Sequence, residues 1–333
     1  MKFITRDYNS ISLNPAEGTL TKTSTNSKLI DEMTYFQEIS SQTDPYLKLL
    51  YPRLISFETT EEFCRMEMEY YPFKNLGNYI TDETPFGEEF WINVLEMLFS
   101  VIERMKKTTA SYSDDHIRRF CASMFIDKTL REYDSLRNNF PFFDSMANFP
   151  VLEINGKEYR NFNSIWEEIL GEIEELIEEE KVFNVIHGDM CFSNILLGEH
   201  PESNSILRLI DPRGEFGIKG VFGSSLYDYA KLSHSISGGY EFFIYDRFKV
   251  ENTEPGSNKF TLKLIDSVNK EMCEKLFLQH MQMNPNMLRK VKLIEGLIFI
   301  GMCARHYDSF DRQQAMYLTG IKTLNEVINE NLC

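Results

Sequence analysis

The stretch Ile186–Asn194 reads IHGDMCFSN and lies between two apolar runs, Val182–Ile186 and Ile195–Leu197. A second acidic signal follows in Leu209–Gly214, which reads LIDPRG and overlaps the apolar run Ile206–Ile210. This pattern predicts a short loop between two strands, followed by a carboxylate at the end of a further strand. We therefore expect the polar side chains of the loop and of the strand end to face one cleft.

These residue types match the needs of phosphoryl transfer, in which the enzyme mainly positions groups and neutralises charge. Asp189 is the candidate catalytic base, because its carboxylate could take the proton of an acceptor hydroxyl. Asn194 and Asp211 are the candidate Mg²⁺ ligands, since this cation prefers oxygen ligands. The alternative is that Asp189 and Asn194 only cap turns, as both residue types often do. His187 is expected to be structural, buried and bonded to backbone near the loop.

Length and charge narrow the class of protein. The chain has 333 residues, enough for two domains or one two-lobed enzyme. Its formal net charge of -16 argues against a nucleic-acid partner, which would need clustered Lys and Arg to neutralise phosphate. The start, MKFITRD, lacks the apolar region of a signal peptide, and the most apolar segment, Gly296–Ala304, is too short to span a bilayer.

From these features we expect a cytoplasmic protein without membrane insertion. The six cysteines have no zinc-finger or C-x-x-C spacing, so reduced thiols are expected. Cys191 lies inside the loop but has no flanking His or Lys that would activate it as a nucleophile. The sequence does not determine the oligomeric state.

Periodicity divides the chain into two unequal parts. Residues 1–72 are predicted to be a β-rich lobe, with strands at 10–13, 19–25, 53–57 and 63–70 and one helix at 27–40. Residues 73–333 are predicted to be mainly helical, with helices at 90–104, at 116–136, from a capping box at Ser164–Glu167, and through most of 262–333. Asn155-Gly156 between alternating residues predicts an inserted β-hairpin at 151–160. The expected fold class is α+β, with a small β-rich lobe followed by a larger helical lobe.

The motifs carry a family resemblance. His187-Gly188-Asp189 with Asn194, followed by Ile210-Asp211, resembles the aminoglycoside phosphotransferase and choline kinase group within the protein-kinase-like fold. The stretches DPRGEFG (211–217) and YDYAKLSHS (227–235) are similar to putative phosphotransferases of bacterial capsule and surface-polysaccharide gene clusters. The resemblance implies ATP and Mg²⁺ as cofactors, with Asp189 as the base and Asn194 and Asp211 as metal ligands.

The resemblance also implies a role for Asp228, as a buried acidic residue that braces the catalytic loop. From the residues alone, Asp228 could equally complement the dipole at the start of a helix. Residues 1–72 would be the ATP-binding lobe and residues 73–333 the catalytic and acceptor-binding lobe.

The N-terminal part departs from the family pattern, because it contains neither G-x-G-x-x-G nor a Walker motif. The turn Asn14–Gly18 is expected to cover the phosphates in place of that loop. Lys22 is expected to reach the α- and β-phosphates and to pair with Glu32, with Lys28 as the competing lysine. Before the connection between the lobes, the backbone of Glu69 and Tyr71 is expected to bind adenine.

The function expected from these features is ATP-dependent transfer of the γ-phosphoryl group to a hydroxyl group of a small molecule. A sugar or polyol for surface polysaccharide follows from the resemblance, and choline or an aminoglycoside is the alternative. A different class, a non-catalytic nucleotide-binding protein with a kinase-like fold, also stays open. A protein kinase is disfavoured, because the stretch Asp211–Asp228 is short and lacks an A-P-E signature. The 151–160 hairpin either borders the acceptor site or is a structural flap.

Overall fold

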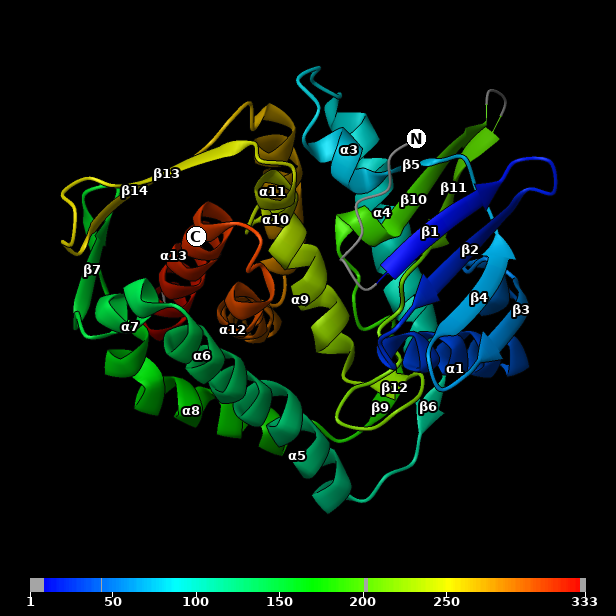
Figure 1. The fold of residues 1–333 in the computed structure, drawn as a ribbon, viewed down its shortest axis with the longest axis horizontal. Coiled ribbons are helices and arrows are strands. Elements are labelled where there is room, and N and C mark those ends of the chain that lie inside the picture. Colours follow the sequence, from blue (N-terminus) through cyan, green and yellow to red (C-terminus); the bar gives the residue numbers. More distant parts are fainter. Residues whose placement is uncertain (1–8, 43, 201–202, 330–333) are drawn as a thin grey trace.

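The computed structural model describes residues 9–42, 44–200 and 203–329. Its N-terminal part is an antiparallel sheet with strand order β1-β2-β4-β3, shown in blue at one side of Figure 1. The two helices α1 and α2 lie between β2 and β3 in the chain. The elements are β1 (Asn9–Asn14), β2 (Thr19–Ser24), α1 (Lys28–Ser41), α2 (Pro45–Leu49), β3 (Leu54–Thr59) and β4 (Cys64–Glu69).

Alternation along β2 and β4 explains why one face of this sheet is covered. Leu20 is paired with Met68 and Lys22 with Met66, so these side chains share one face. Met66 and Met68 are buried, and α1 contacts β3 and β4. Thr21 and its partner Glu67 lie on the opposite face. Lys22 is therefore on the face of the sheet that is turned toward α1.

Two small sheets hold the segments around the IHGDMCFSN stretch. One has the strand order β11-β10-β5 and the other β12-β9-β6. The loop between β9 and β10 is therefore fixed at both ends by hydrogen-bonded strands. Their bounds are β5 (Lys74–Asn75), β6 (Thr109–Ala110), β9 (Phe183–Val185), β10 (Ile195–His200), β11 (Ser203–Leu209) and β12 (Phe222–Gly223).

Helices form most of the remaining chain and pack around α12, the central helix of the larger lobe. Residues 291–301 of α12 are buried without interruption, and α12 packs against α9, α6 and α13. No helix among the described residues is long and apolar enough to cross a membrane. The helices are α3 (Leu76–Ile80), α4 (Glu88–Met105), α5 (Asp114–Ala122), α6 (Lys128–Asn139), α7 (Pro141–Ala147), α8 (Phe162–Glu179), α9 (Ser225–Ile236), α10 (Tyr240–Ile244), α11 (Val268–Met281), α12 (Pro285–Met302) and α13 (Phe310–Ile328).

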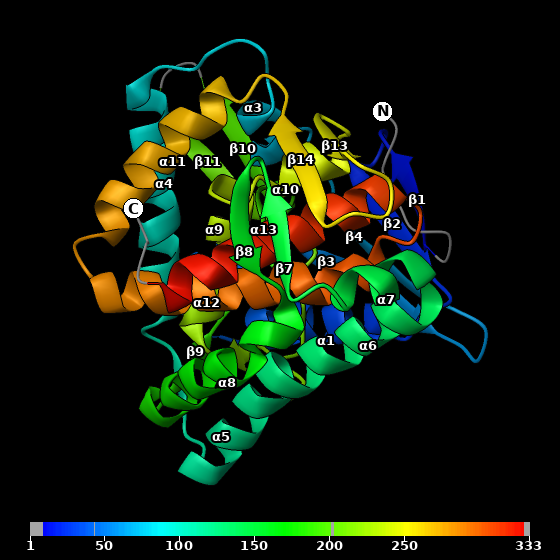
Figure 2. The same cartoon turned by 90° about the vertical axis from the view of Figure 1, so that its left-hand side faces the viewer.

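The predicted hairpin is present as β7 (Val151–Ile154) and β8 (Lys157–Arg160), with Asn155 and Gly156 both at positive φ. It belongs to a larger sheet, β13-β14-β7-β8, whose other strands are β13 (Phe248–Asn252) and β14 (Lys259–Leu264). Figures 1 and 2 show this sheet on the side of the helical lobe that is away from the N-terminal sheet.

Two details of the helical prediction were wrong. The start of the 262–333 region is the end of strand β14, whose pattern KFTLKL alternates as a strand does. The helix placed at the Ser164–Glu167 capping box begins earlier, at Phe162, because Asn161 caps it by accepting a hydrogen bond from the Phe162 backbone. The region 116–136 is helical as predicted, but a π-helical turn at Ser123–Asp127 separates α5 from α6.

A small β-rich lobe followed by a larger helical lobe is the architecture predicted from the sequence, and the structure confirms this two-lobed α+β fold. The boundary at residue 72 lies between β4 and β5, and the division there stays a prediction. The described cysteines are free and buried, as expected from their spacing, and Cys333 lies outside the described residues.

The hairpin turn provides a stability test. Asn155 donates through its side chain to the Leu262 carbonyl and accepts from the Leu262 backbone N–H, both at 2.9 Å. We expect Asn155→Ala to lower the free energy of unfolding by about 1–2 kcal/mol, because it removes both hydrogen bonds and a residue that tolerates positive φ. Urea unfolding measures this loss.

The matched control is Asn139→Ala, because the Asn139 amide bonds only Ser135 on its own helix. That control should change stability by about 0.5 kcal/mol or less. Equal unfolding midpoints for Asn155→Ala and the wild type would contradict a bracing role for Asn155 between the two hairpins.

Candidate active site

A lysine of the small lobe connects two carboxylates from different parts of the chain. The Lys22 Nζ atom on β2 lies 2.6 Å from Oε2 of Glu32 on α1 and 2.8 Å from Oδ1 of Asp211. Lys22 and Glu32 are largely buried, whereas the Asp211 side chain is 51% exposed. Lys28, the competing lysine, is exposed at the start of α1. Of the two lysines, Lys22 is the one that the structure brings to Asp211.

The carboxylates of Glu32 and Asp211 stabilise the positive charge on Lys22. Burial lowers the pKa of Lys22, but the carboxylates of Asp211 and Glu32 outweigh that effect and raise it above its ordinary value. Burial raises the pKa of Asp211, yet Lys22 more than offsets it, and the pKa of Asp211 lies below its ordinary value. The result is a charged lysine and an ionised, solvent-facing carboxylate at the junction of the two lobes.

The structure places the Asn14–Gly18 turn, which is expected to cover the phosphates, beside Tyr70 at the end of β4, and phosphate covering by this turn stays a prediction. The Gly18 carbonyl accepts a hydrogen bond from the Tyr70 backbone N–H at 2.9 Å, which holds the turn at the end of β4. Thr19 pairs with Glu69 there, three residues along the strand from Lys22. At about 3.3 Å per strand residue, the turn lies roughly 10 Å away from the Lys22 position. The turn therefore belongs to the connection between the lobes.

Glu69 and Tyr71 also lie at this connection, and their side chains interact with each other. The Tyr71 hydroxyl donates to Oε2 of Glu69 at 2.8 Å, and Arg53 lies 3.2 Å from the same carboxylate. Arg208 lies over the Tyr71 ring, 4.9 Å from its centroid. Binding of adenine by the backbone of these residues stays a prediction.

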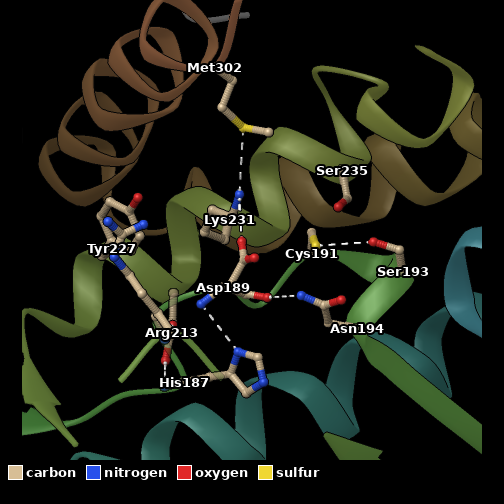
Figure 3. A network of polar contacts seen from close by, with 12 residues as sticks. His187, Asp189, Cys191, Ser193, Asn194, Arg213, Tyr227, Lys231, Ser235 and Met302 are labelled. Atoms are coloured by element: carbon tan, nitrogen blue, oxygen red, sulfur yellow. Dashed lines mark hydrogen bonds and ion pairs between the residues drawn. The ribbon is translucent and has the colours of Figure 1, made fainter. Parts of the chain in front are cut away.

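The loop between β9 and β10 places the Asp189 carboxylate next to a lysine. Oδ1 of Asp189 lies 2.7 Å from the Nζ atom of Lys231 on α9, as Figure 3 shows. Burial raises the pKa of Asp189, but Lys231 outweighs it and lowers the pKa below its ordinary value. The Asp189 side chain is 40% exposed and that of Lys231 only 5%. Asp189 is thus an ionised carboxylate that reaches solvent while its counter-ion is buried beneath it.

The loop needs glycine at position 188. Gly188 has φ of 75°, and a Cβ atom there would lie 2.8 Å from Cβ of Arg213. Arg213 is held in place because its backbone N–H donates to the His187 carbonyl at 2.9 Å. The loop and the segment after Asp211 therefore pack directly against each other.

His187 stabilises this loop through hydrogen bonds between its ring nitrogens and backbone groups. Its Nδ1 atom accepts from the Asp189 backbone N–H at 3.2 Å, so Nε2 carries the proton and donates to the Ile210 carbonyl at 3.0 Å. Burial lowers the pKa of His187 to about 4, which keeps the ring neutral. Tyr51 stacks on the ring at a centroid distance of 6.0 Å.

Asp228 fixes the start of the loop. Its two carboxylate oxygens accept hydrogen bonds from the backbone N–H groups of His187 and Gly188, both at 2.8 Å. Burial raises the pKa of Asp228 to about 7, against the lowering effect of these two hydrogen bonds. The contacts of Asp228 are those of a residue that braces the loop.

Sequence reasoning missed the residues that support the other end of the loop. Oε1 of Glu241 on α10 accepts from the Ser193 backbone N–H at 3.1 Å and from the Ser235 hydroxyl at 2.9 Å. Ser235 in turn accepts from the Phe192 backbone N–H at 2.9 Å. Lys231 was also missed, although it follows Asp228 by three helical residues and so shares its face of α9. Glu241 lies on a separate short helix, and no local pattern indicates it.

Asn194 and Asp211 supply the oxygen atoms expected of a Mg²⁺ site. The Asn194 amide group donates to the Asp189 carbonyl at 2.9 Å, and its Oδ1 atom accepts no hydrogen bond from the described residues. The Asn194 carbonyl accepts from the Ile210 backbone at 3.0 Å, which links the loop to the Asp211 segment. Asp211 has φ of 54°, a conformation that Asp tolerates better than most residues.

No group of three or more His, Cys, Asp or Glu side chains in the described part of the chain could hold a metal alone. Mg²⁺ bound to nucleotide phosphates keeps water and phosphate oxygens and needs only one or two protein carboxylates. One carboxylate and one amide oxygen therefore fit a Mg²⁺ ion that arrives with a nucleotide.

Comparison with known proteins finds likeness only among solved structures. No protein-family model and no curated protein matches the chain. An aminoglycoside-3'-phosphotransferase of type VIII is 14% identical, covering 90% of this chain and 83% of its own, with a TM-score of 0.42. The aminoglycoside phosphotransferase APH(3'')-Id from Streptomyces rimosus is 12% identical, covering 97% and 91%, with a TM-score of 0.42. Likeness at this level assigns neither a family nor a substrate to this chain.

The chain's own geometry describes the fold class. A strand lysine of the small lobe pairs with a glutamate on the following helix, and both meet a carboxylate that follows a strand of the large lobe. Protein kinases hold ATP with this arrangement of Lys, Glu and Asp between two lobes. The fold is a two-lobed α+β fold of the kinase-like type.

The brace formed by Asp228 can be tested by an isosteric change. In Asp228→Asn the amide oxygen would still accept from one backbone N–H group, but the amide N–H would face the other, and these two opposed donors would both be unsatisfied. We expect a loss of about 1–3 kcal/mol in the free energy of unfolding, measured by urea denaturation. Asp246→Asn is the control, because Asp246 is 66% exposed and pairs with Arg312 at the surface. If both variants lose the same free energy of unfolding, the two backbone contacts of Asp228 contribute no more to stability than a surface ion pair.

The buried His187 predicts a pH dependence of stability. Folding lowers the pKa of His187 from 6.5 to about 4, so the unfolded chain binds more protons between these values. The contribution of His187 is therefore complete above pH 6.5 and is lost as the pH falls toward 4, by up to about 3 kcal/mol. In Mg²⁺-free urea titrations, the stability gap between wild type and His187→Asn should narrow from pH 7 to pH 4.5. A gap that stays constant would contradict the buried, neutral ring.

Proposed function

We propose that this protein is an ATP- and Mg²⁺-dependent phosphotransferase that moves the γ-phosphoryl group of ATP to a hydroxyl group of a small acceptor. One observation carries the proposal: Lys22, Glu32 and Asp211 meet at the lobe junction. The ionised carboxylate of Asp189 lies on a loop that is hydrogen-bonded to the Asp211 segment through Asn194 and Ile210. Few other chemistries need this set of charges at the boundary between two lobes.

The residues divide the work by their chemistry. Lys22 neutralises the α- and β-phosphates. Its ammonium group is directed at them by the ion pair with Glu32. Asn194 and Asp211 hold Mg²⁺, which when bound neutralises charge on the phosphate oxygens. Asp189 accepts a hydrogen bond from the acceptor hydroxyl and takes its proton late in the transfer.

One P–O bond forms and one P–O bond breaks in this step. The acceptor oxygen forms a bond to the γ-phosphorus as the bond to the β,γ-bridging oxygen breaks. The products are the phosphorylated acceptor and ADP, and the hydroxyl proton is released through Asp189. Lys231 keeps the Asp189 carboxylate ionised and directed until the proton arrives.

The same proposal divides the chain at residue 72 into an ATP-binding lobe and a catalytic lobe. It also includes adenine binding by the backbone of Glu69 and Tyr71. The acceptor class proposed is a sugar or polyol, consistent with the motif resemblance to surface-polysaccharide phosphotransferases and with a cytoplasmic location. The second class, a non-catalytic nucleotide-binding protein, is disfavoured because the charges of Asp189 and Asp211 are both maintained by buried lysines.

Replacing the base tests the reaction directly. We expect Asp189→Asn to lower kcat for the best acceptor by about 10²- to 10⁴-fold, since the general base is lost. Binding of Mg-ATP, followed as an increase in melting temperature, should persist. The assay measures ADP release with a panel of sugars, polyols, choline and aminoglycosides.

Asp246→Asn is again the surface control and should retain full turnover. If Asp189→Asn phosphorylates the best acceptor as fast as the wild type, Asp189 is not the base. If Mg-ATP raises the melting temperature but no acceptor is phosphorylated by the wild type, the non-catalytic alternative is supported instead.

A further inference from the structure

Four cationic side chains, from three helical segments and one loop, form a group near the Asp189 loop. Lys231 on α9 contacts the Asp189 carboxylate, and Arg213 packs against Gly188 of the same loop. Lys128 at the start of α6 lies 3.4 Å from the Tyr227 hydroxyl on α9. Arg305, in the short 3-10 helix Cys303–Arg305, pairs across to α6. We call Lys128, Arg213, Lys231 and Arg305 the basic cluster.

Two of these four cations form ion pairs with carboxylates, so the cluster keeps an excess of positive charge. Lys231 pairs with Asp189, and Arg305 pairs with Glu132 at 2.7 Å. Within the described ranges, neither Lys128 nor Arg213 forms an ion pair: the Lys128 ammonium contacts the hydroxyl and ring of Tyr227, and Arg213 donates from Nε to the Glu215 carbonyl. This local excess of positive charge lies in a chain whose formal net charge is -16.

The like charges of the cluster act on one another. Burial lowers the pKa of Lys128 well below its ordinary value, and the charges of Arg213, Arg305 and Lys231 lower it further, while the Glu132 carboxylate acts in the opposite direction. Holding a desolvated ammonium among other cations costs free energy unless an anion compensates it. The arrangement is therefore unfavourable for the protein alone.

Packing accounts for only part of Lys128. Its aliphatic stem lines a small cavity of about 10 Å³ with Met124, Phe125 and Tyr227, which has room for no more than a water molecule. An apolar side chain would fill this place without a charge. The ammonium group contacts the hydroxyl and the ring of Tyr227, and it forms no ion pair with a carboxylate of the described residues.

Every member of the cluster except Lys231 is partly exposed to solvent. Asp189 is 40% exposed and Arg305 is 22% exposed, and Lys128 and Arg213 are half-buried. Lys22, by contrast, is paired with Glu32 and Asp211 at the lobe junction. The proposed nucleotide ligands and the basic cluster thus approach Asp189 from different elements; Figure 3 shows Arg213, Tyr227 and Lys231 around the Asp189 loop.

We propose that the acceptor is anionic, a hydroxyl compound that carries a phosphate ester or a carboxylate, and that Lys128, Arg213 and Arg305 bind this group while Asp189 faces the hydroxyl. The inference rests on the proposed phosphotransferase function and names its substrate class. A cationic acceptor such as choline or an aminoglycoside would be repelled by the same three side chains.

Matched acceptors that differ in one charge test the inference. The pairs are glycerol with glycerate and glycerol phosphate, and glucose with glucuronate and glucose 6-phosphate; choline and kanamycin represent cations. We expect kcat/KM with Mg-ATP for an anionic member to exceed that of its neutral counterpart by about 10-fold or more, the value of one charge-assisted hydrogen bond. A preference for a neutral or cationic acceptor would overturn the inference.

Substitutions then connect the preference to the cluster. Lys128→Met and Arg213→Met should each lower kcat/KM for the preferred anionic acceptor by about 10- to 100-fold, while the neutral counterpart changes by about 3-fold or less. Lys322→Met is the matched control, because Lys322 is 54% exposed on α13 and lies 3.8 Å from Glu326. Melting temperatures establish that each variant is folded, and Arg305→Met replaces any variant that is not.

The KM for ATP separates this site from the nucleotide site. If the substitutions raise the KM for Mg-ATP and affect all acceptors alike, the cluster serves the γ-phosphate and the inference is overturned.

A binding measurement tests the inference if none of these acceptors is phosphorylated. With Mg²⁺ and a non-hydrolysable ATP analogue present, calorimetry should detect glycerol phosphate or glucose 6-phosphate binding to the wild type, and at least 10-fold weaker binding to Lys128→Met. Absence of binding by every anionic compound would overturn the inference. A protein that does not bind Mg-ATP at all overturns the proposed function itself, which is a separate result.

Discussion

The site depends on one carboxylate that never faces solvent. Asp228 on α9 accepts the backbone N–H groups of His187 and Gly188 with its two oxygens, both at 2.8 Å. Gly188 then turns with positive φ, and the carboxylate of the next residue, Asp189, is 40% exposed and paired with Lys231. A loop held only at its strand ends would leave that carboxylate free to move, and catalysis loses much of its rate when groups shift by about 1 Å.

Electrostatics add a second constraint. Asp189 and Asp211 repel each other, and the charge of Asp189 acts to raise the pKa of Asp211. Each carboxylate nevertheless stays ionised because each has its own lysine: Lys231 in the helical lobe for Asp189, and Lys22 in the small lobe for Asp211. Two ionised acidic groups can therefore lie close together, as the proposed roles of Asp189 as base and Asp211 as metal ligand require. Lys22 also links the lobes, since its partners lie in both.

Much of this could be predicted from the sequence where the signal is local. Alternation in β2, helical periodicity in α1 and the spacing of the HGD and IDPRG segments led to Lys22, Glu32, Asp189, Asn194 and Asp211. The Asn155-Gly156 turn was found because few residues adopt its backbone conformation. The place of the Asn14–Gly18 turn relative to Lys22 could not be predicted, because the end of the sheet at which a hairpin turn lies depends on strand order. That order, β1-β2-β4-β3, is a property of the assembled sheet.

The sequence by itself determined the fold class, the kinds of groups at the site and their order along the chain, because periodicity, turn chemistry and short motifs act over a few residues. Only the tertiary structure decided which cations meet which carboxylates. Lys231 finds Asp189 from forty-two positions away, and Glu241, Lys128 and Arg305 approach the loop from separate helical segments. Electrostatic interactions depend on the distance between charges in space, and the number of residues between them in the chain does not give that distance. The proposed preference for an anionic acceptor therefore rests on the folded molecule.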